Sequence, residues 1–279
     1  MKYRFPVKDV LLKETETVPA VNSPVASGDM WQASGTEFSL QAFGVGDFYV
    51  RDGREIRYSP LPGADPGWVQ LYLNGQVLVA LLHQRKIINF HASSFIHEGR
   101  GVMALGDTGA GKSSLTVSLV LSGAGFLSDD LTPLIFREGV PYILPLNRRV
   151  KIREGTAVQL NIGPDSLAEA ETGTGKKYLN LSQPEVADHA LHTILRIETG
   201  DVREPMFYEP SRADKFSLLR SEICSWEYLT GMPETEREYL RQLVRILEQV
   251  HFIRVVRPVE IAIVVLHDAV SRYLKGMDV

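Results

Sequence analysis

The chain of 279 residues carries 30 Lys and Arg against 34 Asp and Glu, so its formal net charge is −4. This mildly negative balance argues against a large nucleic-acid footprint and gives no support for an anionic membrane surface. Because no apolar run approaches a bilayer span and the single cysteine, Cys224, cannot close an internal disulfide, we expect a protein of the cytoplasm without membrane contact.

The first quarter of the chain consists of short apolar stretches broken by turn residues. Strand-like patterns occur in three segments, 38–43, 48–50 and 56–58. Residues 69–85 carry a dense apolar face that predicts a helix, although its first half also fits a buried strand. We therefore expect a small β-rich N-terminal region over residues 1–80, followed by a larger domain over residues 81–279.

Two strands and a helix are predicted next. Residues 87–96 and 101–105 fit buried strands joined by a short turn, and residues 114–121 fit a helix. Between the second strand and the helix lies the sequence GDTGAGKSS, which begins at Gly106 and matches the phosphate-loop pattern G-x-x-x-x-G-K-[ST] at each fixed position. A strand before the motif and a helix after it are the context that this motif requires.

The chemistry of this loop suits the phosphates of a nucleotide. Glycines let successive backbone amides turn into one concavity, and the following helix adds its unpaired N–H groups. Lys112 is predicted to reach the β- and γ-phosphates, and the Ser113 hydroxyl to join the coordination of Mg²⁺. The alternative, a glycine-rich turn that binds nothing, is disfavoured by the fitting context. We expect phosphate contacts from Gly106, Asp107, Thr108, Gly109, Ala110, Gly111, Lys112, Ser113 and Ser114.

A short apolar strand after the loop helix ends in two adjacent acids, Asp129 and Asp130. In a parallel sheet, the end of that strand lies on the same edge as the phosphate loop. One carboxylate there can hold Mg²⁺, and the second can accept the proton of an incoming hydroxyl. Repulsion between the two raises the pKa of one of them. A solvated turn is the alternative, and the nearby phosphate loop favours the functional interpretation.

His91 and two basic clusters are further candidates for the site. A histidine in an apolar strand is commonly a hydrogen-bonded core residue, but a histidine that faces the site can bond an aspartate or the transferring phosphoryl group. The sequence leaves both interpretations of His91 open. The basic residues can likewise neutralise phosphate charge or form solvated faces; they are Arg148, Arg149, Lys151, Arg153, Lys176 and Lys177.

The remainder of the chain alternates strands, loops and helices. Strands are predicted over residues 134–136, 142–144, 192–198 and 252–257. Residues 164–175 are polar and glycine-containing, which indicates a mobile loop. Thr235 and Glu238 form a capping box at the start of a helix, and residues 261–274 predict a final helix that is a candidate interface between copies.

Three segments resemble the catalytic core of the HPr kinase/phosphorylase family, whose fold is related to that of ATP-dependent phosphoenolpyruvate carboxykinases. They are His91-Ala92-Ser93-Ser94, the phosphate loop, and Leu127-Ser128-Asp129-Asp130. The spacing fits as well, with 21 positions from His91 to Lys112 (112 − 91) and 17 from Lys112 to Asp129 (129 − 112). Other segments resemble a divergent kinase-like branch, some of whose members accompany the enzymes of lasso-peptide clusters; these are Leu82–Arg85, Lys176–Tyr178 and Val255–Pro258.

This resemblance implies an α/β fold with a P-loop kinase core of the HPr kinase / phosphoenolpyruvate carboxykinase type behind the small β-rich region. It implies that Lys112 and Ser113 bind phosphates and Mg²⁺, that Asp129 is the general base, that Asp130 supports the metal or the base, and that His91 orients the acids. The family's downstream Glu-x-Arg-Gly signature is not reproduced at residues 152–155, so a third metal ligand is not identified. Because relatives assemble, a homo-oligomer is compatible with the resemblance.

We therefore expect an ATP-dependent, Mg²⁺-requiring kinase that phosphorylates a serine hydroxyl of a protein or peptide partner. Two alternatives stay open. The first is a kinase of a small hydroxylated metabolite such as free serine, and the second is a nucleotide-binding module without transfer activity. No motif that reads the base of the donor nucleotide is recognisable.

Overall fold

The computed structural model describes residues 3–146, 149–170, 175–181 and 187–277. The chain divides into two compact units, one formed by Met1–Asn89 with Ile223–Val244 and the other by Phe90–Glu222 with Arg245–Val279. Both units combine helices with sheets, so the predicted mixed α/β class is confirmed in this general form. The predicted division after residue 80 stays a prediction. Within the described ranges, no helix is long and apolar enough to cross a bilayer.

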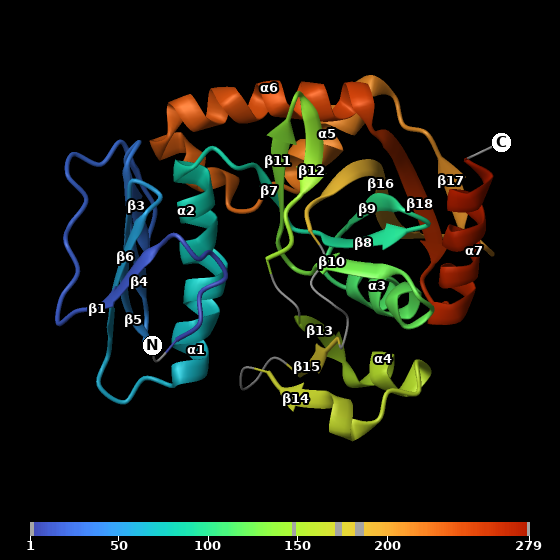
Figure 1. The fold of residues 1–279 in the computed structure, drawn as a ribbon, viewed down its shortest axis with the longest axis horizontal. Helices are drawn as coiled ribbons and strands as arrows, with labels where there is room; N and C mark the ends of the chain where they lie inside the picture. The colour runs from blue at the N-terminus through green and yellow to red at the C-terminus, as the bar shows by residue number, and fades with distance from the viewer. Residues whose placement is uncertain (1–2, 147–148, 171–174, 182–186, 278–279) are drawn as a thin grey trace. The chain divides into compact units, whose positions relative to one another are not determined.

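The first unit is built on a six-stranded sheet with the order β1-β6-β5-β4-β3-β2 (Figure 1). Its strands are β1 (Leu11–Glu14), β2 (Ala26–Ser27), β3 (Trp31–Ala33), β4 (Glu37–Ala42), β5 (Gly46–Arg51) and β6 (Glu55–Pro60). Neighbouring strands are antiparallel except for the parallel pair β1 and β6. The predicted strands of this region are confirmed by β4, β5 and β6, and β5 and β6 form a hairpin.

Helical segments complete the first unit. They are α1 (Pro66–Tyr72), a π-helical segment (Leu73–Val77), α2 (Leu78–Gln84), a 3₁₀ segment (Trp226–Gly231) and the first part of α6 (Pro233–Gln249). The predicted helix over residues 69–85 is confirmed. The predicted capping box is wrong, because α6 begins at Pro233 and the Thr235 hydroxyl instead donates to the carbonyl oxygen of His83 at 3.2 Å. Proline suits the first turn of a helix, where its missing N–H has no partner to lose.

The second unit contains a nine-stranded sheet, whose main path is β10-β8-β9-β16-β12-β11-β7 and whose strand β18 pairs with β16 and β17. The strands are β7 (Asn89–Phe90), β8 (Ser93–His97), β9 (Arg100–Leu105), β10 (Gly125–Ser128), β11 (Thr132–Arg137), β12 (Val140–Ile143), β16 (His189–Gly200), β17 (Met206–Tyr208) and β18 (His251–Pro258). Strands β9, β16 and β18 run parallel. Their carboxyl ends therefore meet at one edge of the sheet.

One expectation about this sheet needs correction. The predicted strand over residues 87–96 is interrupted, because β7 ends at Phe90 and β8 begins at Ser93, which places His91 in the break. The acidic strand β10 is not a neighbour of β9, since β8 lies between them and pairs antiparallel with both. Two antiparallel steps give β10 the direction of β9. Asp129 and Asp130, which come directly after β10, therefore lie at the same edge of the sheet as the end of β9.

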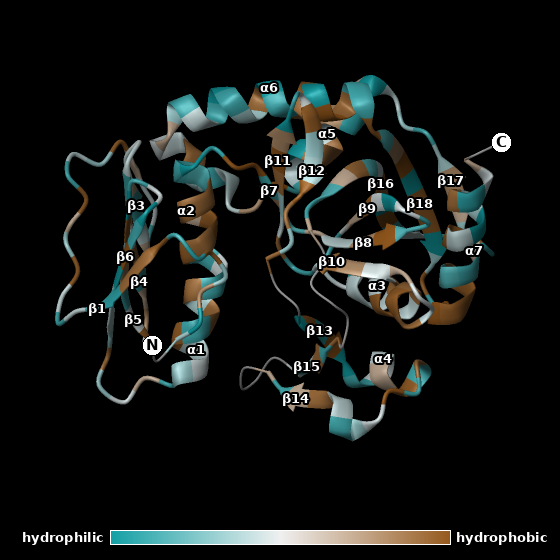
Figure 2. Ribbon diagram, in the orientation of Figure 1, coloured by the Kyte–Doolittle hydropathy of each residue, from teal (hydrophilic) through white to brown (hydrophobic). Residues whose placement is uncertain are grey.

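Helices α3 (Lys112–Leu121), α5 (Arg212–Ser221) and α7 (Ile263–Gly276) belong to this unit. Buried side chains of α3, of the strands and of α7 form one core, which includes Leu115, Leu119, Leu195, Val255 and Val270. Figure 2 shows the corresponding concentration of hydrophobic residues in β18. The helix that follows β9 is thus fixed by burial along its length, which holds its first residue, Lys112, at the edge of the sheet.

A three-stranded antiparallel sheet with the order β13-β15-β14 also belongs to the second unit. It comprises β13 (Arg149–Arg153), β14 (Leu167–Glu169) and β15 (Lys176–Asn180), with α4 (Glu154–Gln159) and a 3₁₀ turn (Pro164–Ser166) between β13 and β14. Val150 and Ile152 of β13 are buried in the same core as α3, so the alternate residues face the other way. The predicted mobile loop over 164–175 is wrong for residues 164–169, and its residues 171–174 lie outside the described ranges.

Candidate active site

The loop between β9 and α3, called here the glycine loop (Gly106–Gly111), is held in a backbone shape that requires glycine. Gly106, Gly109 and Gly111 have φ angles of 144°, 90° and 104°. A Cβ atom on Gly106 would lie 2.4 Å from the carbonyl oxygen of Ile197. Because that oxygen belongs to the backbone of β16, it cannot move aside as a flexible side chain could. Positive φ at successive glycines turns backbone amides inward and makes an anion-binding concavity.

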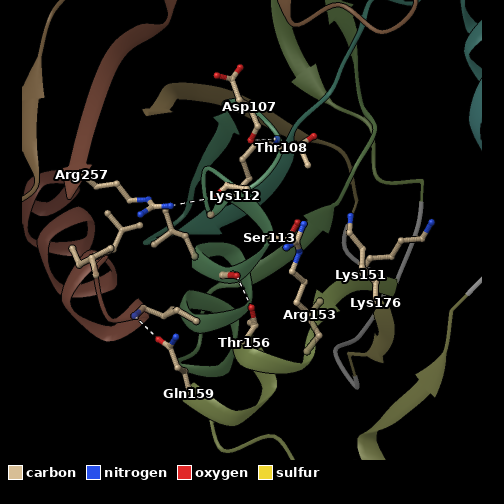
Figure 3. Close-up of a pocket in the computed structure, with 18 of the residues that line it drawn as sticks. Asp107, Thr108, Lys112, Ser113, Lys151, Arg153, Thr156, Gln159, Lys176 and Arg257 are labelled. Atoms are coloured by element: carbon tan, nitrogen blue, oxygen red, sulfur yellow. Dashed lines mark hydrogen bonds between the residues drawn. The ribbon is translucent and has the colours of Figure 1, made fainter. Parts of the chain in front are cut away.

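The glycine loop opens into a pocket of about 810 Å³ within the second unit (Figure 3). Lining residues come from the loop, from β13 and β15, from α4 and from the start of α7. All predicted phosphate contacts except Gly106 and Ala110 are among them, and so are His91 and Asp130. The structure therefore brings the sequence motifs to one cavity whose volume suits a small-molecule ligand.

Lys112 is turned toward the glycine loop itself. Its ammonium group donates to the carbonyl oxygens of Gly106 at 2.5 Å and Asp107 at 3.4 Å, and the residue is buried. Burial lowers the pKa of Lys112, whereas the charges of Glu222, Asp130 and Asp129 act in the opposite direction. A buried ammonium that is hydrogen-bonded to two neutral carbonyl oxygens has an electrostatic preference for an anion.

Asp129 contacts the residue that follows this lysine. Its Oδ1 accepts hydrogen bonds from the Ser93 hydroxyl and from the Ser113 hydroxyl, the latter at 2.9 Å, and its Oδ2 accepts from the backbone N–H of Lys151 at 3.2 Å. Burial raises the pKa of Asp129 to about 6, the charge of Asp130 adds to this, and the three hydrogen bonds oppose it. The carboxylate of Asp129 therefore lies against the start of α3, and its pKa is about one unit below neutral pH.

Asp130 and His91 both line the pocket. Asp130 has a φ of 64°, a left-handed conformation that aspartate tolerates better than most residues. Burial and the charge of Lys112 lower the pKa of His91, while the charge of Asp130 raises it. Of the two interpretations left open by the sequence, the position of His91 in the pocket lining favours the one in which it faces the site. Its role stays a prediction.

The two basic clusters divide between the pocket and other surroundings. Lys151, Arg153 and Lys176 line the pocket, because the register of β13 with β15 pairs Arg153 with Lys176 (Figure 3). Lys177 forms an ion pair with Glu169 at 3.6 Å. The other members are Arg149, whose guanidinium lies 5.6 Å from the ring centroid of Tyr178, and Arg148, which lies outside the described residues.

Arg257 at the end of β18 braces the glycine loop, a role that the sequence does not predict. Its Nε donates to the carbonyl oxygen of Ala110 at 2.8 Å and one terminal nitrogen donates to that of Gly109 at 3.1 Å. The planar guanidinium can reach both carbonyls at once, which an ammonium group cannot do with the same geometry. The signal in the sequence is slight, since it consists of one arginine before the proline that ends a strand.

A buried ion pair lies next to the first glycine of the loop. The Nε of Arg196 is 3.2 Å from Oε1 of Glu222, and a terminal nitrogen of Arg196 is 3.1 Å from Oδ1 of Asp107. The side chains of Arg196 and Glu222 are each 8% exposed. Burial raises the pKa of Glu222, and the charges of Arg196 and Lys112 lower it. The sequence gives no sign of this pair, because Arg196 of β16 and Glu222 at the end of α5 meet only in the folded chain.

The oxygen atoms at the start of α3 fit a magnesium ion. The Ser113 hydroxyl and the Asp129 carboxylate are in contact, and Asp130 follows directly in the chain. Among the described residues there is no group of three or more His, Cys, Asp or Glu side chains that could hold a metal by itself. Mg²⁺ commonly binds through one or two carboxylates together with substrate phosphates and water, so this sparse oxygen set suits it.

No protein-family model matches the chain, and no curated protein matches it. Among solved structures, the chain is similar to the Hpr(Ser) kinase/phosphatase from Coxiella burnetii, with 14% sequence identity and a TM-score of 0.38, over 68% of this chain and 99% of that one. This distant likeness names the same family that the sequence motifs resemble.

Proposed function

We propose that the chain is an ATP-dependent, Mg²⁺-requiring kinase that transfers the γ-phosphoryl group to a serine hydroxyl of a protein or peptide. The second unit would then be a P-loop kinase core of the HPr kinase type. The observation that carries the proposal is the hydrogen bond between the Ser113 hydroxyl and Asp129, which joins the first turn of α3 to the acidic pair. The second acid of the pair, Asp130, lines the same pocket as Ser113. The choice of a protein or peptide acceptor rests on the family resemblance of the motifs.

The glycine loop would hold the phosphates of the donor. Amides of the loop and of the first turn of α3 point toward an anion, and the dipole of α3 favours negative charge at the same place. Lys112 would exchange its bonds to loop carbonyls for bonds to the β- and γ-phosphates. Arg257 and Arg196 would keep the loop in shape while this exchange takes place.

The acidic pair would supply the metal ligands and the base. Ser113 and Asp130 would hold Mg²⁺, which supplies charge neutralisation for the phosphates when it is bound. Asp129 would accept the proton of the serine hydroxyl as that oxygen bonds to the γ-phosphorus and the bond from phosphorus to the β–γ bridging oxygen breaks, which releases ADP. His91 would orient the two acids from the pocket wall.

The assignment of the base has support and one observation against it. A pKa of about 6 leaves Asp129 ionised at neutral pH and basic enough to accept a proton. However, Asp129 is buried, and its neighbour Asp130 is the acid that lines the pocket. A test of the proposal therefore has to compare variants of both acids.

Transfer of label from ATP labelled at its γ-phosphorus tests the proposal. We expect wild-type protein to label a library of serine-containing peptides in the presence of Mg²⁺ but not alanine-substituted versions of the same peptides. Removal of a general base lowers rates by about a hundredfold or more, so Asp129→Asn should lose labelling to at least that extent. Asp201→Asn, at an exposed acid of the same unit, is the matched control and should keep wild-type activity.

Each other outcome has a clear meaning. Loss in Asp130→Asn but not in Asp129→Asn exchanges the roles of the two acids. Labelling of free serine but of no peptide identifies a metabolite kinase instead. Tight binding of Mg²⁺ and ATP with no labelling of any hydroxyl compound leaves a nucleotide-binding module and contradicts the proposed transfer.

A further inference from the structure

One side of the pocket is apolar and takes no part in the chemistry above. It is formed by the connection between β18 and α7 and by the first turns of α7, where the lining residues are Val259, Glu260, Ile261, Ala262, Ile263 and Leu266. Val259 is 71% exposed. Figure 2 shows the first turn of α7 as hydrophobic. Apolar side chains held open beside a charged loop are typical of a binding site for a ligand with an apolar part.

The polar and apolar sides of the pocket lie on opposite sides of the start of α3. Figure 3 shows Lys151 and Lys176 on one side of Lys112 and Ser113, and Arg257 and Gln159 on the other. Asp129 belongs to the lysine side, because its Oδ2 accepts from the backbone N–H of Lys151. The acids and the apolar residues are therefore separated by the phosphate-binding loop.

The apolar residues belong to the side of Gln159 and Arg257. The side-chain oxygen of Gln159 accepts a hydrogen bond from the backbone N–H of Ile263 at 3.1 Å. A terminal nitrogen of Arg257 donates to the carbonyl oxygen of Val259 at 3.0 Å. These two bonds fix the connection before α7 next to the glycine loop. We call Val259, Ile261 and Ile263 the apolar shelf.

We propose that the apolar shelf and Gln159 bind the nucleoside of the donor nucleotide. This inference rests on the proposed function, because that function fixes the direction of the triphosphate. With the γ-phosphoryl group at Asp129 and the β-phosphate at Lys112, the α-phosphate and ribose leave the loop toward the opposite side. The base then covers the shelf, and the amide nitrogen of Gln159 is placed to donate to the ribose or to the edge of the base.

Calorimetric titration with two probes, Mg²⁺ with ATP and Mg²⁺ with inorganic tripolyphosphate, tests this assignment. Both probes carry the triphosphate, but only ATP carries a nucleoside. A double variant, Val259→Ser with Ile261→Ser, removes apolar surface from the shelf, so its affinity for ATP should fall by about tenfold. Its affinity for tripolyphosphate should stay within about twofold of wild type, since the glycine loop is unchanged.

Val264→Ser is the matched control, because Val264 lies in the first turn of α7 and is 57% exposed but does not line the pocket. It should bind both probes as wild type does. The assignment is overturned if the double variant keeps wild-type affinity for ATP, loses affinity for both probes equally, or behaves like Val264→Ser. Lys112→Ala tests the proposed function separately, because it should weaken both probes; if it weakens neither, the phosphates do not bind at the loop.

Discussion

Asp129 is the residue whose protonation the proposed chemistry depends on most. Burial, reinforced by the charge of Asp130, raises its pKa to about 6. A base must be ionised before it accepts a proton, so kcat/KM, which reports the pKa of the free enzyme, should be constant above this pKa and fall about tenfold per pH unit below it. A pH profile of label transfer between pH 5 and 8 measures this. A profile that stays flat down to pH 5 would show that another group accepts the proton.

Gly106 offers a second test at the scale of one residue. A Cβ atom there would meet the carbonyl oxygen of Ile197 at 2.4 Å, and its φ of 144° is strained for any other residue. Gly106→Ala should therefore displace the loop, lower the free energy of unfolding by about 2 kcal/mol or more and abolish nucleotide binding. Gly123→Ala is the control, since Gly123 also has positive φ but no atom within 4 Å of its added Cβ.

For Gly123→Ala, we expect a loss of about 1 kcal/mol from the conformation alone and unchanged nucleotide affinity. Urea unfolding and calorimetry measure both quantities. Equal effects of the two substitutions would mean that the contact of Gly106 with Ile197 has no part in shaping the loop.

At the scale of single residues, the sequence predicts those site residues that belong to a contiguous motif or follow one predicted element. The glycines, Lys112 and Ser113 form one contiguous motif, and the acids follow a single strand pattern, so their arrangement could be inferred without the fold. Ser93 bonds to Asp129, and Glu222 pairs with Arg196, only because distant strands and a helix end meet in the folded chain. Their positions depend on sheet register, which local sequence patterns do not reveal.

The strand β18 acts on the site through its last residues. Arg257 donates to two carbonyl oxygens of the glycine loop through two nitrogens held in one plane, and the single ammonium nitrogen of a lysine cannot reproduce that fixed geometry. Arg257→Lys should therefore weaken binding of Mg²⁺ and ATP by about tenfold. Arg254→Lys on the same strand is the control, because Arg254 bonds to Glu198 with its side chain 48% exposed. Calorimetry that finds both variants equal to wild type would contradict a bracing role for Arg257.

The elements around the site show why sequence patterns predict some structure and miss other parts. The strand, glycine loop and helix from residue 100 to 121 follow the predicted order, because each has a strong local pattern. Residues 87–96 fit one strand by composition, but the chain breaks at His91, whose N–H bonds to the carbonyl oxygen of Glu222 at 2.8 Å. The strand β14 was not predicted, because its three residues gain stability only from pairing with β15.

At the scale of the whole molecule, the first unit has a pH dependence of its own. His83 is fully buried, and burial lowers its pKa to about 4. Below about pH 6.5, this histidine is protonated in the unfolded chain but stays neutral in the folded unit. Its contribution to the free energy of unfolding is therefore fully present above that pH and is lost as the pH falls toward 4. This residue should cost the first unit about 2 kcal/mol between pH 7 and pH 5.

Tryptophan fluorescence can measure that unit alone, because Trp31, Trp68 and Trp226 all belong to it. Urea unfolding followed by fluorescence should give a lower midpoint at pH 5 than at pH 7 in wild-type protein. Glutamine does not titrate and can still donate to the carbonyl oxygen of Cys224. In His83→Gln, the loss of unfolding free energy between pH 7 and pH 5 should therefore be smaller than in wild type by about 2 kcal/mol. An equal pH dependence in both proteins would mean that His83 is not the group responsible.

Calorimetric titration of Mg²⁺ with ATP into wild-type protein and Lys112→Ala tests most directly whether the glycine loop is a nucleotide site. We expect saturable binding by wild type and an affinity lower by about a hundredfold in Lys112→Ala, because the variant loses charged hydrogen bonds to two phosphates. Lys275→Ala, which removes an exposed ammonium paired with Glu98, is the control and should bind as wild type does. Wild-type affinity in Lys112→Ala, or no binding by the wild-type protein, would contradict the proposed site and the phosphoryl transfer that depends on it.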